Sequence, residues 1–306
     1  MESFRHTKKK ITELKQHGIL FGTIKKIMNN GKKNGFQLVQ MFFATRNRFM
    51  KTVELKQIQH KIKIGHQPKE LPPTLFEDSL FVVDGKPIGF YLSQLPNKLK
   101  NLANIADAEL NSSRVPKSEM KRSSGLFGSE EKDIRQYSCI IGSIPPKPHM
   151  RRSYASRSSV HSSKTAQTFI KAMVKIGIES LEIIKSISPE IYINHKKSVE
   201  ERVPEKWRFA DLFTSSISNC NIACGIHQDN LNVKNAINVI ITKRRNATGG
   251  NLYVPDYETT FNSADNSMLV YPAWRNMHGV TPIIPTHENG YRNSLIWYAL
   301  DGFNKH

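Results

Sequence analysis

The chain is poor in cysteine, in acidic side chains and in long apolar runs. Its 306 residues include 3 cysteines, an odd number that fits neither a disulfide framework nor a zinc module. No apolar run approaches the roughly 18 residues of a membrane span, and the first residues lack the apolar core of a secretory signal. We therefore expect an intracellular protein of a reducing compartment, with no membrane contact.

Acidic residues are scarce in an uneven way. Asp and Glu number 26 against 45 Lys and Arg, which gives a net charge of +19. Residues 1–69 hold 16 basic against 3 acidic side chains, whereas residues 209–306 hold 7 of each. The excess positive charge near the N-terminus indicates that this segment binds a polyanion electrostatically. The alternative is an ordinary solvated basic face on a pair of helices.

Hydrophobic periodicity divides the chain near Pro72-Pro73. Before that point the spacing predicts helices over 7–33 and 36–50 and a basic strand over 51–69, so residues 1–72 form a basic, mainly helical N-terminal segment. After it, residues 73–306 form a second domain. Within this domain the pattern predicts a hairpin over 81–91 around Asp-Gly, a loop-rich segment over 111–163, and an amphipathic helix over 164–186 on the outside of a barrel.

From residue 209 onward short strand-like runs alternate with turn signals such as Thr248-Gly249-Gly250. Antiparallel strands at this spacing favour a jelly roll, whose open end is a natural ligand pocket. The fold class is therefore predicted to be α+β, with a double-stranded β-helix core over about residues 205–303 and flanking helices.

Three metal-ligand residue types occur in an informative order within this core. His227 and Asp229 stand two apart, so on an extended segment both side chains project from the same face. His278 follows after several predicted strands. Two imidazoles and one carboxylate make the facial triad typical of non-haem Fe(II) oxygenases, which leaves positions open for an oxo-acid and O₂. The triad therefore predicts Fe(II), with 2-oxoglutarate and O₂ as co-substrates.

Arg292 follows His278 in a run with strand-like alternation. A guanidinium there suits the distal carboxylate of 2-oxoglutarate, which it can bind bidentately. Ser294 lies on the same face of the strand and adds a hydroxyl to the clamp. Taken singly, each histidine reads more simply as a structural residue, and Cys220 and Cys224 as buried thiols rather than a second metal site. The ordered set is what predicts the iron site.

The same stretch resembles a known family, the TET/J-binding-protein superfamily of nucleobase oxygenases, and within it the compact phage and viral members. The resemblance covers roughly residues 135–303. It is carried by Phe213-Thr214-Ser215, His227-Gln228-Asp229, Gly249-Gly250-Asn251-Leu252-Tyr253-Val254-Pro255, Asn266-Ser267-Met268-Leu269, His278-Gly279-Val280-Thr281-Pro282 and Tyr291-Arg292-Asn293-Ser294-Leu295-Ile296-Trp297-Tyr298.

The resemblance implies hydroxylation of the C5-methyl group of a pyrimidine in DNA. It places the ligands at His227, Asp229 and His278 and the co-substrate at Arg292. It also implies base contacts from a polar residue three positions after the metal Asp, here Asn232, and from an aromatic residue six positions after the Arg, here Tyr298. The histidine that TET-type members carry two positions later is Leu300 here, so the particular base stays open, with 5-methylcytosine favoured over thymine.

A base inside a duplex cannot reach such a site, so we expect a flipped or single-stranded pyrimidine as partner. Arg151, Arg152 and Arg157 are predicted to contact the DNA backbone, with residues 1–72 as a further DNA-gripping module. No obligate protein partner is evident. Two alternatives remain: an oxygenase acting on RNA, protein or a small molecule, and a non-catalytic nucleic-acid-binding barrel. The compartment would be the host cytoplasm for a phage protein, or the nucleus for a eukaryotic or viral one.

Overall fold

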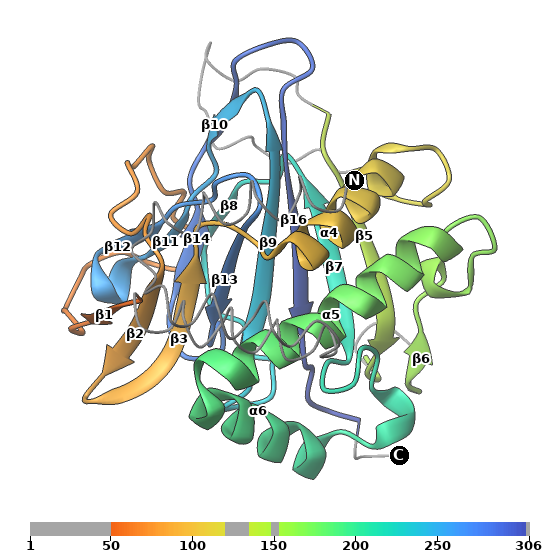
Figure 1. Ribbon diagram of the computed structural model, residues 1–306, viewed down its shortest axis with the longest axis horizontal. Coiled ribbons are helices and arrows are strands. Elements are labelled where there is room, and N and C mark those ends of the chain that lie inside the picture. Colours follow the sequence, from red (N-terminus) through yellow and green to blue (C-terminus); the bar gives the residue numbers. More distant parts are fainter. Residues whose placement is uncertain (1–49, 120–134, 148–152, 304–306) are drawn as a thin grey trace, which may run out of the picture. The chain divides into compact units, whose positions relative to one another are not determined.

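Figure 1 shows the computed structural model, which describes residues 50–119, 135–147 and 153–303. These residues belong to one compact unit. Residues 50–72 are part of that unit, so the predicted boundary at residue 72 does not separate two compact units. The helices expected over 7–33 and 36–50 lie outside the described residues.

The larger layer is a ten-stranded sheet in which all neighbours are antiparallel except the first pair. The expected hairpin over 81–91 is present, and Asp84 and Gly85 make its turn with φ of 51° and 72°. In spatial order the strands are β1 (Lys51–Glu54), β2 (Ser79–Val83), β3 (Lys86–Leu92), β13 (Ser267–Tyr271), β9 (Asn238–Arg245), β16 (Tyr291–Tyr298), β7 (Ser215–Cys220), β5 (Tyr137–Ile144) and β4 (Ser118–Glu119), with β6 (Ser156–Arg157) beside β5.

A four-stranded sheet makes the smaller layer. An apolar cluster that includes Phe81, Leu252, Phe261 and Tyr271 joins residues of the two layers. This arrangement confirms the predicted α+β class and its jelly-roll core. The smaller sheet runs β12 (Thr259–Phe261), β11 (Leu252–Val254), β14 (His278–Val280) and β8 (Cys224–His227), and a separate pair joins β10 (Ala247–Gly249) to β15 (Ile283–Pro285).

Helices cover the outer face of the larger sheet, as Figure 1 shows for α5. The predicted helix over 164–186 is confirmed as α5 (Gln167–Ile187), and the indole of Trp297 donates to the carbonyl oxygen of Met173 at 3.0 Å. Gly177 permits the close packing, because a Cβ there would lie 2.5 Å from that of Ala210. The other helices are α4 (Asn97–Asn111), α6 (Pro189–Arg202), η3 (Val160–Ser162), η4 (Glu205–Trp207) and η5 (Pro255–Tyr257).

Two segments differ from expectation. Of the basic strand predicted over 51–69, only β1 is a strand. The rest is irregular chain, of which Gly65 and His66 form backbone hydrogen bonds to Ile226 of the smaller sheet. The loop-rich segment over 111–163 contains β5, which pairs with β7 along six residues. Within the described ranges no helix is long and apolar enough to cross a membrane.

Alternation along the larger sheet gives its inner face two distinct rows of side chains. On β16, Arg292, Ser294, Ile296 and Tyr298 line an internal cavity, while the intervening side chains face the helices. In register with Ser294 is a polar row, and in register with Ile296 is an apolar row. The polar row comprises Ser138, Asn219, Ser294, Thr242 and Ser267, and the apolar row comprises Ile140, Ile217, Ile296, Ile240 and Leu269.

Candidate metal and co-substrate site

The structure brings the three predicted metal ligands together. His227 ends β8 and His278 begins β14, and the two residues are direct partners across the smaller sheet. Asp229 follows His227 by two positions. One ligand atom from each of the three side chains lies within 4.8 Å of the others, and within the described ranges this is the one such cluster of His, Cys, Asp or Glu. The geometry suits a single divalent ion held from one side.

Both imidazoles are oriented by backbone carbonyl groups. Nδ1 of His227 lies 2.9 Å from the carbonyl oxygen of Gly225, and Nδ1 of His278 lies 3.1 Å from that of Asn276. A hydrogen on Nδ1 leaves Nε2 unprotonated as the metal-binding atom. Nε2 of His227 accordingly lies 3.6 Å from Oδ1 of Asp229.

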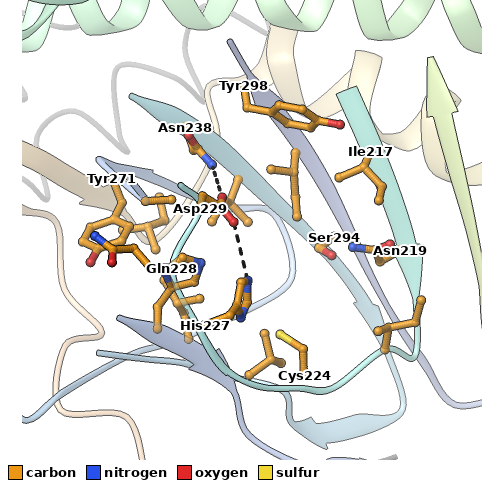
Figure 2. A pocket seen from close by; sticks show the side chains of 18 of the residues that line it. Ile217, Asn219, Cys224, His227, Gln228, Asp229, Asn238, Tyr271, Ser294 and Tyr298 are labelled. Atoms are coloured by element: carbon orange, nitrogen blue, oxygen red, sulfur yellow. Dashed lines mark hydrogen bonds and ion pairs between the residues drawn. The ribbon is translucent and has the colours of Figure 1, made fainter. Parts of the chain in front are cut away.

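Asp229 is oriented by two asparagines. Nδ2 of Asn232 and Nδ2 of Asn238 donate to its Oδ2 at 3.3 Å and 3.2 Å, and Asn232 also donates to Oδ1 of Asn238 at 3.0 Å. Figure 2 shows the line from Asn238 through Asp229 to His227. Because Oδ2 is occupied by amide donors, Oδ1 remains for the metal.

The protonation states of the two histidines differ without a metal. Burial and the neighbouring His227 lower the pKa of His278, which is therefore neutral and ready to bind a cation. Contact with the Cys224 thiol raises the pKa of His227 to about 9, against the opposing effect of burial. A metal must displace that proton, so metal binding weakens as pH falls.

Arg292 is a buried cation whose donors are only partly used. Its side chain is 3% exposed, Nη2 donates to Oγ of Ser263 at 3.3 Å, and Nε has no hydrogen-bond partner within the described residues. Burial, followed by the nearby Arg244, lowers its pKa to about 10, which leaves it charged at neutral pH. Burying a charge without a partner is costly. The site is therefore built for an anion.

Gly250, the second glycine of a turn, makes room for the side chain of Arg292. Gly249 and Gly250 both have positive φ, at 66° and 64°, which favours glycine. A Cβ at Gly250 would lie 3.2 Å from Cδ of Arg292. Ser294 lies two residues further along the same wall, as predicted, and Figure 2 shows it beside its register partner Asn219.

The triad, Arg292 and Ser294 line one cavity of about 900 Å³. Such a volume lies at the upper end of ordinary ligand pockets and has room for a small dicarboxylate together with a second ligand. Tyr298 and Asn232, predicted to contact a base, also line it. Burial, followed by the carboxylate of Asp229, raises the pKa of Tyr298, so the phenol stays neutral. Leu300 forms a β-bridge with Asn232 at the same wall.

The predicted backbone contacts have a different outcome. Arg151 and Arg152 lie outside the described residues. The guanidinium of Arg157 donates to Oγ of Ser143 at 2.7 Å and to the carbonyl oxygen of Lys206 at 2.8 Å, so it is engaged within the chain. A phosphate contact of Arg157 stays a prediction.

Sequence reasoning missed several residues of the cavity. Asn238 begins β9, and its role depends on the fold bringing it beside Asp229. Asn219 and Ser138 belong to strands whose alternation was the available signal. Cys224 was predicted to be a buried structural thiol, but it is only partly buried, and its thiol borders both His227 and Arg292. Ile64, Gly65 and Gln67 also line the cavity, although they were assigned to the N-terminal segment.

Comparison with known proteins supports the fold. No protein-family model and no curated protein matches the chain. A solved structure of NgTET1 in complex with 5mC DNA is 14% identical, with a TM-score of 0.56 over 89% of this chain and 93% of that chain. A 2OG-Fe(II) oxygenase family oxidoreductase from Burkholderia pseudomallei is 14% identical and has a TM-score of 0.44 over 71% and 88%. A Pseudomonas putida prolyl-4-hydroxylase is 11% identical, with a TM-score of 0.36 over 67% and 88%.

The chain thus has the double-stranded β-helix fold of 2-oxoglutarate oxygenases. Its donor set, two histidines and one aspartate, suits Fe(II). The guanidinium of Arg292 lies in the same cavity, and its Nε has no hydrogen-bond partner among the described residues, which suits the distal carboxylate of 2-oxoglutarate. The fold is thus that of the double-stranded β-helix oxygenases, and the residues of the cavity suit Fe(II) and 2-oxoglutarate.

Cys224 offers a test of co-substrate binding that needs no turnover. Its side chain is partly exposed, whereas Cys139 and Cys220 are buried. We expect iodoacetamide to alkylate Cys224 first, because a thiol must be reached to react. With Mn(II) present, 2-oxoglutarate at ten times its Kd should slow that alkylation about tenfold, as followed by peptide mass spectrometry. Equal labelling rates with and without 2-oxoglutarate would place the co-substrate elsewhere.

Proposed function

We propose that this chain is an Fe(II)- and 2-oxoglutarate-dependent dioxygenase that hydroxylates the C5-methyl group of a pyrimidine in DNA. The observation that carries the proposal is one cavity lined by the triad, by Arg292, whose Nε has no partner among the described residues, and by the half-buried Tyr298. 5-Methylcytosine is favoured over thymine, because one solved neighbour, which matches 89% of this chain, is in complex with 5mC DNA. The compact phage and viral members of the TET/J-binding-protein superfamily are the proposed relatives.

Each residue has a task in this proposal. His227, Asp229 and His278 hold the iron from one side. Arg292 and Ser294 hold the distal carboxylate and so fix where the keto acid meets the metal. When bound, Fe(II) and 2-oxoglutarate activate O₂, so that one oxygen atom enters the methyl group and the other enters succinate, with release of CO₂.

The substrate side of the cavity is assigned to Tyr298 and Asn232. The ring of Tyr298 offers a face on which a base can stack, and its raised pKa keeps the phenol uncharged. Asn232 is buried and donates to Asp229, so a base contact would couple substrate position to the metal carboxylate. The isoleucines of the apolar row, among them Ile217 and Ile296, exclude water around the methyl group. An extrahelical or single-stranded pyrimidine is required.

The test is direct analysis of bases. Purified protein is incubated with Fe(II), 2-oxoglutarate and 5-methylcytosine DNA, and nucleosides and succinate are quantified by mass spectrometry. We expect 5-hydroxymethylcytosine with matching succinate, both lost when 2-oxoglutarate is omitted. DNA that contains thymine but no 5-methylcytosine should give less hydroxymethylated base and less succinate.

Other outcomes point to other functions. Succinate without altered bases would reject DNA as substrate and favour an oxygenase of RNA, protein or a small molecule. Neither succinate nor altered bases, in protein shown to bind metal, would favour a non-catalytic barrel.

A further inference from the structure

A basic strap, residues 56–69, runs along the free edge of the smaller sheet beside the metal site. The N–H of Gly65 donates to the carbonyl oxygen of Ile226 at 2.7 Å, and the N–H of Ile226 donates to that of His66 at 2.8 Å. Ile226 immediately precedes the metal ligand His227. Further along, Nε2 of Gln67 donates to the carbonyl oxygen of Val280 at 3.2 Å. The strap is therefore fixed to the two strands that carry the histidines.

The strap is fixed again before it reaches the site. The N–H of Ile58 donates to the backbone oxygen of Asp256 at 2.8 Å, and Nε2 of His60 lies 2.7 Å from the carboxylate of the same residue. Close contacts leave no room for slippage, because a Cβ at Gly225 would lie 2.9 Å from the carbonyl oxygen of Gly65. The chain between these anchors is a short, held loop.

At the tip of this loop a tight turn presents one apolar side chain. The N–H of His66 donates to the carbonyl oxygen of Lys63 at 3.1 Å, and Gly65 has a φ of 87°. These are the features of a type II turn with Ile64 and Gly65 in its centre. The side chain of Ile64 is 66% exposed and lines the mouth of the cavity. Leu231, 67% exposed, lines the same cavity from the loop after Asp229.

Charge surrounds this apolar tip. The strap contains Lys56, Lys61, Lys63 and Lys69, all exposed, and no acidic residue. Lys63 is adjacent to Ile64 in the turn. A DNA duplex presents phosphates that lysines can bind and stacked bases between which an apolar side chain can insert. A fixed apolar side chain flanked by lysines at the mouth of a pocket suits such a partner.

We propose that the basic strap is the duplex-opening element of this enzyme: Ile64 inserts into the base stack where the target pyrimidine leaves it, while the strap lysines bind the flanking phosphates. The inference rests on the proposed function. It deepens that function by naming double-stranded DNA as the substrate form. A wedge must be stiff to unstack bases, and the two anchors and the turn supply that stiffness.

The alternative partner, an unpaired strand, makes a different demand. A single strand binds through a basic groove and stacking platforms, and needs no apolar wedge at the mouth. If the strap bound only single strands, its lysines would make the contacts and the side chain of Ile64 would not be needed. Removing the bulk of Ile64 therefore separates the two forms of substrate.

The experiment compares one strand in two states. Initial rates of 5-methylcytosine oxidation are measured on a duplex and on its isolated methylated strand, for the wild type and for Ile64→Ala. The first central position of a type II turn tolerates alanine, so the turn is kept. We expect the ratio of duplex rate to single-strand rate to fall about tenfold. Ile64→Met, which restores apolar bulk, should recover most of that ratio.

Controls and a second readout keep the test sharp. Ile178→Ala removes an exposed isoleucine from α5, on the opposite face of the larger sheet, and should leave the ratio unchanged. Without 2-oxoglutarate, 2-aminopurine placed beside the methylcytosine should brighten when wild-type protein binds the duplex, and brighten less with Ile64→Ala. The double variant Lys61→Gln and Lys63→Gln should reduce the slope of log affinity against log salt concentration for duplex binding by about 2, one for each lost phosphate contact. The control pair Lys171→Gln and Lys175→Gln on α5 should leave this slope unchanged.

Failures of the two proposals differ. An unchanged ratio in Ile64→Ala, or a wild type that oxidises single strands and leaves duplexes intact, overturns the duplex-opening role and keeps the oxygenase. No oxidation of either DNA form by the wild type overturns the proposed function, and the strap's role with it.

Discussion

Asp229→Asn is expected to lose both the metal and turnover, although the substitution changes one atom. The reason lies in Asn232 and Asn238, which both donate to Oδ2 of Asp229. An amide at position 229 satisfies those donors only by turning its oxygen toward them. Its NH₂ group then faces the position of the ion, and an amide NH₂ cannot ligate a cation. Loss of one ligand is expected to reduce turnover on the order of 10³-fold.

The measurements are succinate formation and the Kd of Mn(II). Asp211→Asn supplies a matched control, because Asp211 is exposed, has a φ of 65° that asparagine tolerates, and does not line the cavity. It should behave as wild type. Asn238→Ala, which removes one orienting donor and keeps the ligand, should weaken metal binding by about 10- to 100-fold. An Asp229→Asn variant that kept wild-type affinity for Mn(II) would contradict the assigned ligand set.

Local spacing explains why some of this site could be predicted from the sequence. His227 and Asp229 need only an extended backbone to share a face, and Arg292 and Ser294 need only a strand. These pairs lie within two residues of each other, so their relation does not depend on the fold. The jelly-roll core was predictable for the same reason, since short alternating runs separated by turn signals are local features.

The parts that could not be predicted depend on contacts between distant segments. Asn238 orients Asp229 because β9 passes beside the loop after β8. The strap was assigned to the N-terminal segment because it precedes Pro72-Pro73. Its place at the cavity is set by hydrogen bonds from Gly65 and Gln67 to strands far along the chain. β5 was hidden in a segment rich in serine and basic residues. Its own residues, among them Tyr137, Ile140 and Ile141, favour a strand, and its pairing with β7 fixes its place in the sheet.

Arg292→Met is expected to weaken 2-oxoglutarate binding and, in the absence of co-substrate, to stabilise the protein. The first effect follows from removing the buried cation that would meet the distal carboxylate. Truncating one partner of a buried charge pair costs about 2–5 kcal/mol, so the KM for 2-oxoglutarate should rise on the order of 10²-fold or more. Arg292→Lys keeps the charge and loses the fork geometry, and should give an intermediate KM.

The second effect follows from the state of Arg292 in the free protein. Its guanidinium is buried beside Arg244, and Nε has no partner within the described residues. Replacing an unpaired buried charge by an apolar side chain of similar length removes a desolvation cost, which should raise the melting temperature of the ligand-free chain. With Mn(II) and 2-oxoglutarate at a concentration that saturates the wild type but not the variant, the order should reverse, because the wild type gains more stability from the co-substrate.

This reversal separates a functional arginine from a structural one. Arg114→Met provides the comparison, since Arg114 is exposed and paired with Glu109, with Nη2 and Oε1 2.7 Å apart; it should shift the melting temperature little in either condition. A ligand-free Arg292→Met chain that melted several degrees below wild type would show that the guanidinium serves the fold. A site that binds an anion must bury its cation before the anion arrives, and this burial lowers the stability of the ligand-free chain. A destabilised Arg292→Met chain would therefore argue against an anion site at Arg292.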